Sequence, residues 1–241
     1  MGEFLLTSLI VFFAGCINSI TGFGFALLSV PFLSLTFGPK VAVPLAVLLG
    51  TALDIMLFAG CYKHADLRRV LHLFSGAIIG LPFGVYVLSA LSGDSLRTLI
   101  GAVTIMLALT LSLGIRKHFR RERLASVGAG LVSGALKGST GMLGPPVVLL
   151  GLNQDWPQTL FRSTIIAYFT LVSLCALPVL AGFGLLTEHT IKLSLAGLPA
   201  LVLGLAGGTK LRSRVSHAFF RRIALALTML AGASGIYHGL F

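Results

Sequence analysis

The sequence predicts an all-α protein that crosses a membrane many times. It is expected to hold two inverted repeats, each a broken or re-entrant hairpin plus three transmembrane helices. The first observation is composition: 56% of the 241 residues are apolar, only 10% are charged, and the mean hydropathy is +0.99. A soluble domain of this length needs a charged surface that this composition does not supply. The other observations are long apolar segments and an internal repeat.

The apolar residues fall into eight segments. The stretch Phe4–Pro39 contains no Asp, Glu, Lys or Arg at all. A helix needs roughly 20 apolar residues to cross the hydrocarbon core of a bilayer, and each segment is near or above that length. The predicted segments are 4–37, 41–62, 70–93, 96–115, 124–152, 160–183, 190–210 and 219–240. We therefore expect the lipid bilayer to be the chain's main surroundings.

The net charge of +11 has a simple explanation in such a chain. Most basic residues lie in short loops between segments, where they set membrane orientation, so we expect no nucleic-acid partner. The three cysteines lie in apolar segments without paired spacing and are interpreted as small buried residues. No group of residues has the spacing of a metal site, and we expect no metal and no cofactor.

An internal repeat divides the chain. The residues from Gly15 to Gly22 match those from Gly134 to Gly141 at an offset of 119 positions. Glycines spaced by four follow in the first half and match small residues in the second; they are Gly76, Gly80 and Gly84, with Ala200, Gly204 and Gly208. Such stripes let transmembrane helices approach closely. The predicted organisation is a first membrane repeat (1–115), a basic cytoplasmic linker (116–123) and a second membrane repeat (124–241).

The basic clusters favour a re-entrant form for the fifth segment. The clusters are Lys63–Arg69, Arg116–Arg123 and Lys210–Arg222. If all eight segments crossed the membrane, the third cluster would lie opposite the first two, against the cytoplasmic preference of Lys and Arg. If the fifth segment enters the membrane and returns to the same side, all three basic clusters lie on the cytoplasmic side. By the symmetry of the repeat, the first segment should also be re-entrant, entering from the other face of the membrane. Each of its two half-helices would have about a dozen residues. A long, tilted and kinked helix is the alternative.

Polar residues and glycines mark the two interruptions. The candidate substrate-binding residues are Asn18, Ser19, Thr21, Gly22 and Gly24 in the first, and Lys137, Ser139, Thr140 and Gly141 in the second. Glycine permits a turn, and hydroxyls and freed backbone N–H groups can replace the hydration shell of an anion. In lipid, such groups persist where they line a cavity or are buried in protein. A polar contact between packed helices is the alternative.

Two charged residues lie deep in apolar segments. Lys137 is about 13 residues into its segment, roughly 20 Å along a helix, where a cation is costly and usually functional. We expect it to attract an anion; an ion pair or an escape to the surface is the alternative. Asp54 could pair with Lys137, carry a coupling proton or make a structural contact. Arg162 opens the sixth segment and either gathers anions or sets topology.

Three further classes of protein are alternatives to a transporter. A membrane-embedded enzyme needs a catalytic constellation, and no metalloprotease motif, Ser/Lys pair or paired intramembrane carboxylates occur, so we predict no catalytic residues. A scaffold subunit would use the small-residue stripes but would not need Lys137 at depth. An anion channel shares every feature of a transporter.

Several of these motifs together resemble the TauE/SafE sulfite exporter family. They are the stretch Thr21–Ala26 followed by Pro31, its counterpart from Gly138 to Val148, and the pair Phe161-Arg162. The resemblance covers nearly the whole chain. It implies a multi-pass protein of the bacterial inner membrane that exports sulfite, sulfoacetate or a related sulfur-containing anion, with import proposed for some members. Where many members have consecutive glycines, this chain has Gly22-Phe23-Gly24 and Gly141-Met-Leu-Gly144.

The working hypothesis is transport of a small anionic substrate by alternating access. The two interruptions would form a midplane site between the repeats, as in other transporters built from inverted repeats. Export is the expected direction, because each negative charge that leaves a negative interior gains roughly 2.3 kcal/mol per 100 mV. Proton-coupled import and a channel are the alternatives. The choice of anion and a homodimeric assembly stay open.

Overall fold

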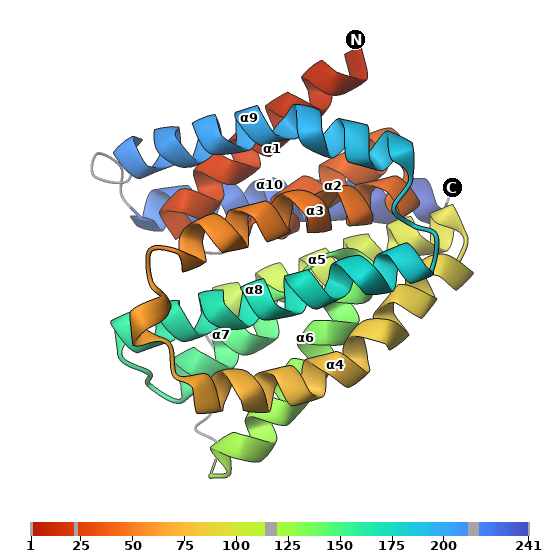
Figure 1. Cartoon of the computed structure of the whole chain (residues 1–241). Coiled ribbons are helices and arrows are strands. Elements are labelled where there is room, and N and C mark those ends of the chain that lie inside the picture. The colour runs from red at the N-terminus through yellow and green to blue at the C-terminus, as the bar shows by residue number, and fades with distance from the viewer. Residues whose placement is uncertain (1, 22–23, 114–119, 212–216, 241) are drawn as a thin grey trace. The chain divides into compact units, whose positions relative to one another are not determined.

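The computed structural model describes residues 2–21, 24–113, 120–211 and 217–240, which form helices joined by short connections (Figure 1). No strand occurs among these residues. The elements are α1 (Gly2–Thr21), α2 (Phe25–Phe37), α3 (Pro39–Phe58), η1 (Tyr62–His64), α4 (Leu67–Ala90), α5 (Gly93–Leu113), α6 (Glu122–Thr140), α7 (Gly144–Asn153), α8 (Gln158–Gly182), α9 (Glu188–Leu211) and α10 (His217–Leu240).

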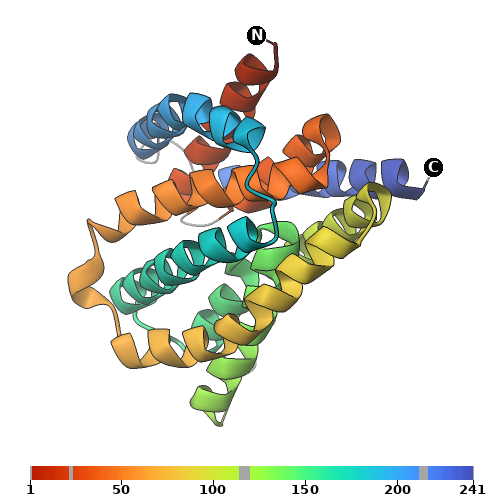
Figure 2. The ribbon, with the colours of Figure 1, turned by 45° about the vertical axis from the view of Figure 1, so that its right-hand side comes forward.

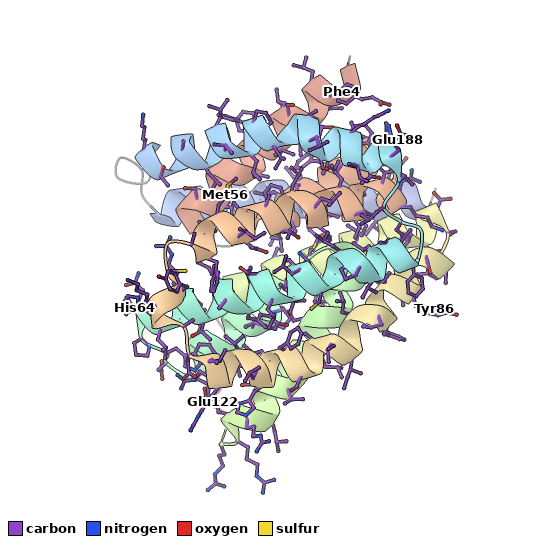
Figure 3. All side chains as sticks on the ribbon, in the orientation of Figure 1. Phe4, Met56, His64, Tyr86, Glu122 and Glu188 are labelled. Carbon is purple, nitrogen blue, oxygen red and sulfur yellow. The ribbon has the colours of Figure 1, made fainter. Side chains whose placement is uncertain are left out.

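The helices follow the predicted segments, with the first and the fifth segment each divided into two helices. Within the described residues, six helices are long and apolar enough to cross a membrane by length and composition; they are α1, α3, α4, α5, α8 and α9. Large apolar side chains also point outward: Phe4 and Tyr86 project from the ribbon in Figure 3. In a protein of this composition such side chains face lipid. The chain is therefore a multi-pass membrane protein.

The chain forms two compact units that each draw on both sequence repeats. Unit 1 comprises Met1–Leu49, Leu91–Ser112 and Leu185–Phe241, and unit 2 comprises Gly50–Ala90 and Leu113–Gly184. Unit 1 thus pairs the first broken segment with α9 from the second repeat. Unit 2 pairs the second broken segment with α4 from the first repeat. The predicted division at 116–123 describes the duplication along the chain, and most of that linker lies outside the described residues.

In unit 2 the glycine stripe of α4 packs against α6, and Figure 2 shows the two helices crossing. A Cβ atom added at any stripe glycine would overlap backbone atoms of α6. Glycines of α6 face α4 in the same way, so the close approach is reciprocal; they are Gly130, Gly134 and Gly138. In the membrane, such packing supplies van der Waals contact that lipid cannot match.

Unit 1 repeats this arrangement with α1 and α9. A Cβ atom at Gly204 would overlap the backbone of α1 at Phe12, and one at Gly208 would overlap it at Cys16. The predicted close approach at the glycine stripes is therefore present in both units. The sequence did not predict that each stripe meets the broken segment of the other repeat.

Both breaks lie inside the predicted interruptions, but the first helix of each broken segment is longer than predicted. α1 has 20 residues and α6 has 19, against about a dozen expected for each first arm. α6 continues through Ser139 and Thr140, whose hydroxyls donate to carbonyls of their own helix, 2.8 Å away in both cases, so these polar side chains have partners without a break in the helix. α6 then ends at Thr140, and the residue after it, Gly141, has a φ of 72°, a left-handed conformation that favours glycine.

The second broken segment returns to the end of unit 2 from which it starts. Trp156, just beyond α7, donates its indole N–H to Glu122 Oε1, in the first turn of α6, at 2.9 Å. Near the turn, the Ser133 hydroxyl donates to the Leu143 carbonyl at 2.5 Å. A straight kinked span would place Trp156 far from Glu122. Residues 122–153 therefore form a hairpin, as a re-entrant segment would, while its course in the membrane and the inverted relation between the repeats stay predictions.

Candidate functional site

Lys137 lies in the last turn of α6, immediately before the break in unit 2. Its side chain is buried, with 4% of the residue exposed. The glycines on either side of it along α6, Gly134 and Gly138, are held against the backbone of α4, which leaves little freedom for this part of the helix. The lysine is thus a cation on a rigid support, deep in an apolar molecule.

Asp54 lies in the part of α3 that belongs to unit 2, and α8 holds it in place. The Ser173 hydroxyl donates to Asp54 Oδ2 at 2.9 Å, and the Thr170 hydroxyl lies 3.2 Å from the Asp54 carbonyl oxygen. Only 9% of Asp54 is exposed. A hydrogen bond from a hydroxyl stabilises a carboxylate at a site where water is scarce.

Lys137 and Asp54 interact electrostatically, but they do not form a direct ion pair. Among the described residues, none places a carboxylate oxygen within 4.0 Å of the Lys137 ammonium, and none accepts a hydrogen bond from it. A buried ammonium without an acceptor is costly. The structure therefore leaves three N–H donors available to an acceptor that is not part of the described chain.

The rest of this break is less suited to bind an anion than its sequence suggests. The Ser139 and Thr140 hydroxyl hydrogens are used within α6, and the Gly141 N–H donates to the Lys137 carbonyl at 3.0 Å. α7 begins at Gly144, and the next two residues are Pro145 and Pro146, which have no N–H. Two of the four N–H groups that a helix start normally leaves free are therefore missing. Lys137 is the main positive group here.

The first break belongs to unit 1 and is only partly described. Asn18 Oδ1 accepts the Phe25 N–H at 3.3 Å, so Asn18 bridges the break and caps the start of α2. The Ser19 hydroxyl donates to the Leu205 carbonyl of α9 at 3.2 Å. Gly24 has a φ of 118°, a conformation that favours glycine. Gly22 and the side chain of Thr21 lie outside the described residues.

Arg162 does not lie with Lys137 and Asp54. It is exposed near the start of α8, where its charge acts on Cys61, just beyond α3. The residues of α8 that hold Asp54 are Thr170 and Ser173, roughly 12–16 Å further along that helix. The structure thus brings together Lys137 and Asp54 in unit 2, and it places Arg162 at one end of that unit.

Sequence reasoning missed the polar residues of α8 and a cluster at the ends of the hairpin. Thr170 and Ser173 are polar positions in an apolar helix, which is the signal that could have found them. The cluster joins Arg69, Glu122 and Trp156: Arg69 Nε lies 2.7 Å from Glu122 Oε1, and its guanidinium lies 4.8 Å from the Trp156 ring. Trp156 is the chain's single tryptophan, and its position after α7 had no obvious partner in the sequence.

Comparison with known proteins supports the expected family. The family model of the sulfite exporter TauE/SafE matches residues 7–235, which is nearly the whole chain. The chain belongs to the TauE/SafE sulfite exporter family. The TauE/SafE match includes both breaks, both glycine stripes and the linker. It points to transport rather than to catalysis.

A curated relative agrees with the TauE/SafE assignment. The chain is 27% identical over 223 residues to the "Probable sulfite/organosulfonate exporter TauE" of Cupriavidus necator, and the alignment covers 90% of this chain and 87% of that protein. No solved structure matches the chain. The structural basis for a function of this TauE/SafE member is therefore the break of unit 2 and the buried Lys137 beside it.

Proposed function

We propose that the protein exports a small sulfur-containing oxyanion, sulfite or an organosulfonate, across the bacterial inner membrane. Membership of the TauE/SafE family supports export of this class of anion, and the Cupriavidus relative carries the same function in its name. The six long apolar helices supply the membrane-spanning frame.

The observation that carries this proposal is the free ammonium of Lys137. It is buried at the break in unit 2, and no described residue accepts its hydrogen bonds. An oxyanion consists of acceptors and a negative charge, so it satisfies both needs of this group. A transported cation would need a ring of oxygen acceptors instead. The Asp54 carboxylate is partly occupied, because Ser173 donates to it.

The proposed mechanism is alternating access around the polar breaks. The anion would bind at Lys137, with polar groups of both interruptions as further ligands, and helix movements would open the site to each side in turn. That the two breaks meet at the bilayer midplane stays a prediction. Export needs no fuel when the interior is negative, since a dianion gains about twice 2.3 kcal/mol per 100 mV on leaving.

The decisive experiment is flux in proteoliposomes that contain the purified protein. Sulfite, sulfate, thiosulfate and small sulfonates are loaded inside, and their release is followed under an imposed membrane potential. Lys137→Met should abolish flux of the transported anion while the protein still folds. Lys192→Met is the matched control, because Lys192 is an exposed residue that pairs with Glu188 on the surface of α9. Its flux should equal that of the wild type.

The same assay distinguishes the alternatives. Saturable release that is accelerated by anion on the other side supports a transporter, whereas flux linear in concentration supports a channel. Uptake driven by an inward pH gradient would support the proton-coupled importer. Normal flux in Lys137→Met would remove the lysine from the site, and no release of any of these anions from wild-type vesicles would overturn the proposal.

A further inference from the structure

Tyr168 is a second buried donor near the break of unit 2. It lies on α8 with none of its surface exposed. Its hydroxyl makes no hydrogen bond with any described residue. A phenylalanine would fill the same space without a polar group, so the hydroxyl costs folding free energy unless something else accepts its hydrogen.

The surroundings of Tyr168 place this hydroxyl on the lysine's side of the hairpin. The Tyr168 hydroxyl approaches that of Ser133 without reaching hydrogen-bond geometry. The hydrogen of Ser133 is already donated to the Leu143 carbonyl, inside the break. Ser133 and Lys137 are four residues apart on α6, so their side chains lie on one face of that helix, one turn apart.

The Asp54 carboxylate is not the missing acceptor for Tyr168. It is held on α8 by Ser173, five residues beyond Tyr168 and therefore about 140° around the helix. The polar group that the structure places beside Tyr168 is Ser133, and Lys137 follows Ser133 by one turn of α6. Two donors from two helices, a hydroxyl and an ammonium, thus stand without acceptors beside the same break.

We propose that Tyr168 binds the transported anion together with Lys137, by donating its O–H to one anion oxygen while the ammonium binds another. This inference rests on the proposed function and specifies its ligand. The site then selects an anion with at least two acceptor oxygens, such as a sulfonate or sulfite, over a monatomic anion such as chloride. Because α8 carries Tyr168 and α6 carries Lys137, binding also ties the hairpin to α8.

The test compares Tyr168→Phe with Tyr86→Phe, the same change at an exposed tyrosine of α4 (Figure 3). Efflux of sulfite and of a small sulfonate is measured over a range of concentrations in proteoliposomes. Tyr168→Phe should raise KM about ten- to hundredfold, the loss expected for one hydrogen bond to a charged group, with little change in maximal rate. Tyr86→Phe should behave as the wild type does.

A thermal-shift measurement separates binding from folding. Without anion, Tyr168→Phe should unfold at the wild-type temperature or above it, because a hydroxyl without a partner has been removed. Added sulfite should raise the unfolding temperature of the wild type and of Tyr86→Phe by more than that of Tyr168→Phe. Chloride at the same ionic strength should not distinguish the three proteins.

The outcomes are distinct. If Tyr168→Phe keeps the wild-type KM and thermal shift while Lys137→Met loses flux, the tyrosine hydroxyl contacts only water and the inference is wrong, although the proposed function stands. If Tyr168→Phe unfolds at a lower temperature than the wild type without anion, and its KM for sulfite does not rise as predicted, the role of Tyr168 is structural. The inference is then also wrong. If wild-type protein neither releases nor binds any of the anions, the inference and the proposed function both fail.

Discussion

At position 137 the second repeat has a lysine where the first repeat has Asn18. The two residues are matched in sequence, but they do different things in the structure. Asn18 uses its side-chain oxygen to cap α2, whereas the Lys137 ammonium has no hydrogen-bond partner among the described residues. Duplication has supplied two similar breaks, and one of them carries the free charge. Because of this asymmetry, our proposal places the anion at Lys137 in unit 2.

Replacing Asp54 tests whether its charge acts on the anion site. The Lys137 ammonium lies more than 4.0 Å from the Asp54 carboxylate, so their attraction is below about 4 kcal/mol at an effective dielectric constant near 20. Asp54→Asn removes this competing negative charge. We expect several-fold tighter sulfite binding, measured as KM for efflux, and lower thermal stability without anion, because the lysine charge is then uncompensated.

Ser173→Ala serves as the companion variant for Asp54→Asn. It removes the hydrogen bond to Asp54 Oδ2 but keeps the charge, so KM should change much less. Equal KM values in Asp54→Asn and the wild type would show that the carboxylate charge does not reach the site. If Asp54→Asn loses the flux that a pH gradient drives, and Ser173→Ala keeps it, Asp54 carries the coupling proton.

At the scale of elements, the position of Lys137 depends on how closely α4 and α6 pack. Glycines on both helices bring the two backbones into contact. No layer of side chains therefore separates α6 from α4 at these positions, and none can rearrange to let α6 move. The cluster of Arg69, Glu122 and Trp156 then holds the far ends of the hairpin together. The break is the part of this hairpin that neither the glycines nor the cluster fixes directly, and we expect the hairpin to move there.

Adding a single methyl group to the glycine stripe tests this packing. A Cβ at Gly80 would overlap the Leu131 carbonyl oxygen, so Gly80→Ala should lower stability by about 1–3 kcal/mol and reduce flux. Gly128→Ala, on α6 itself, has open space around the added Cβ and is the control. It should leave stability unchanged or raise it by up to about 1 kcal/mol through helix propensity. Thermal unfolding in detergent measures both variants, and equal stability would contradict the packing argument.

At the scale of the whole molecule, each compact unit is assembled from both repeats. α6 packs on α4, which is more than 30 residues earlier, and α1 packs on α9, which is synthesised close to the end of the chain. The first broken segment therefore has no glycine-stripe partner until most of the chain has entered the membrane. Neither sequence repeat contains the partner of its own broken segment, so we do not expect a single repeat to fold by itself.

Cysteine labelling tests the topology of the hairpins. After Cys16, Cys61 and Cys175 are replaced, single cysteines are placed at exposed positions around the second hairpin, as Arg121→Cys and Gln158→Cys. A membrane-impermeant reagent should label both from the cytoplasmic side, because the hairpin returns to its starting end. Glu3→Cys and Lys40→Cys should both be labelled from the opposite side if the repeats are inverted. Labelling of 121 and 158 from opposite sides would contradict the re-entrant form.

The amino-acid sequence by itself determined the helical class, the membrane setting, the positions of both breaks and the two buried charges. These are local properties: apolar runs, glycine spacing, and a Lys or Asp with no polar neighbours along the chain. Tertiary structure decided the rest. The hydrogen-bond partners of Asp54 come from α8, and Ser173 is 119 residues from Asp54 along the chain, so only the packed structure shows that these two side chains meet. Likewise, glycines show that a helix can approach another closely, while only the packed units show which helix it meets.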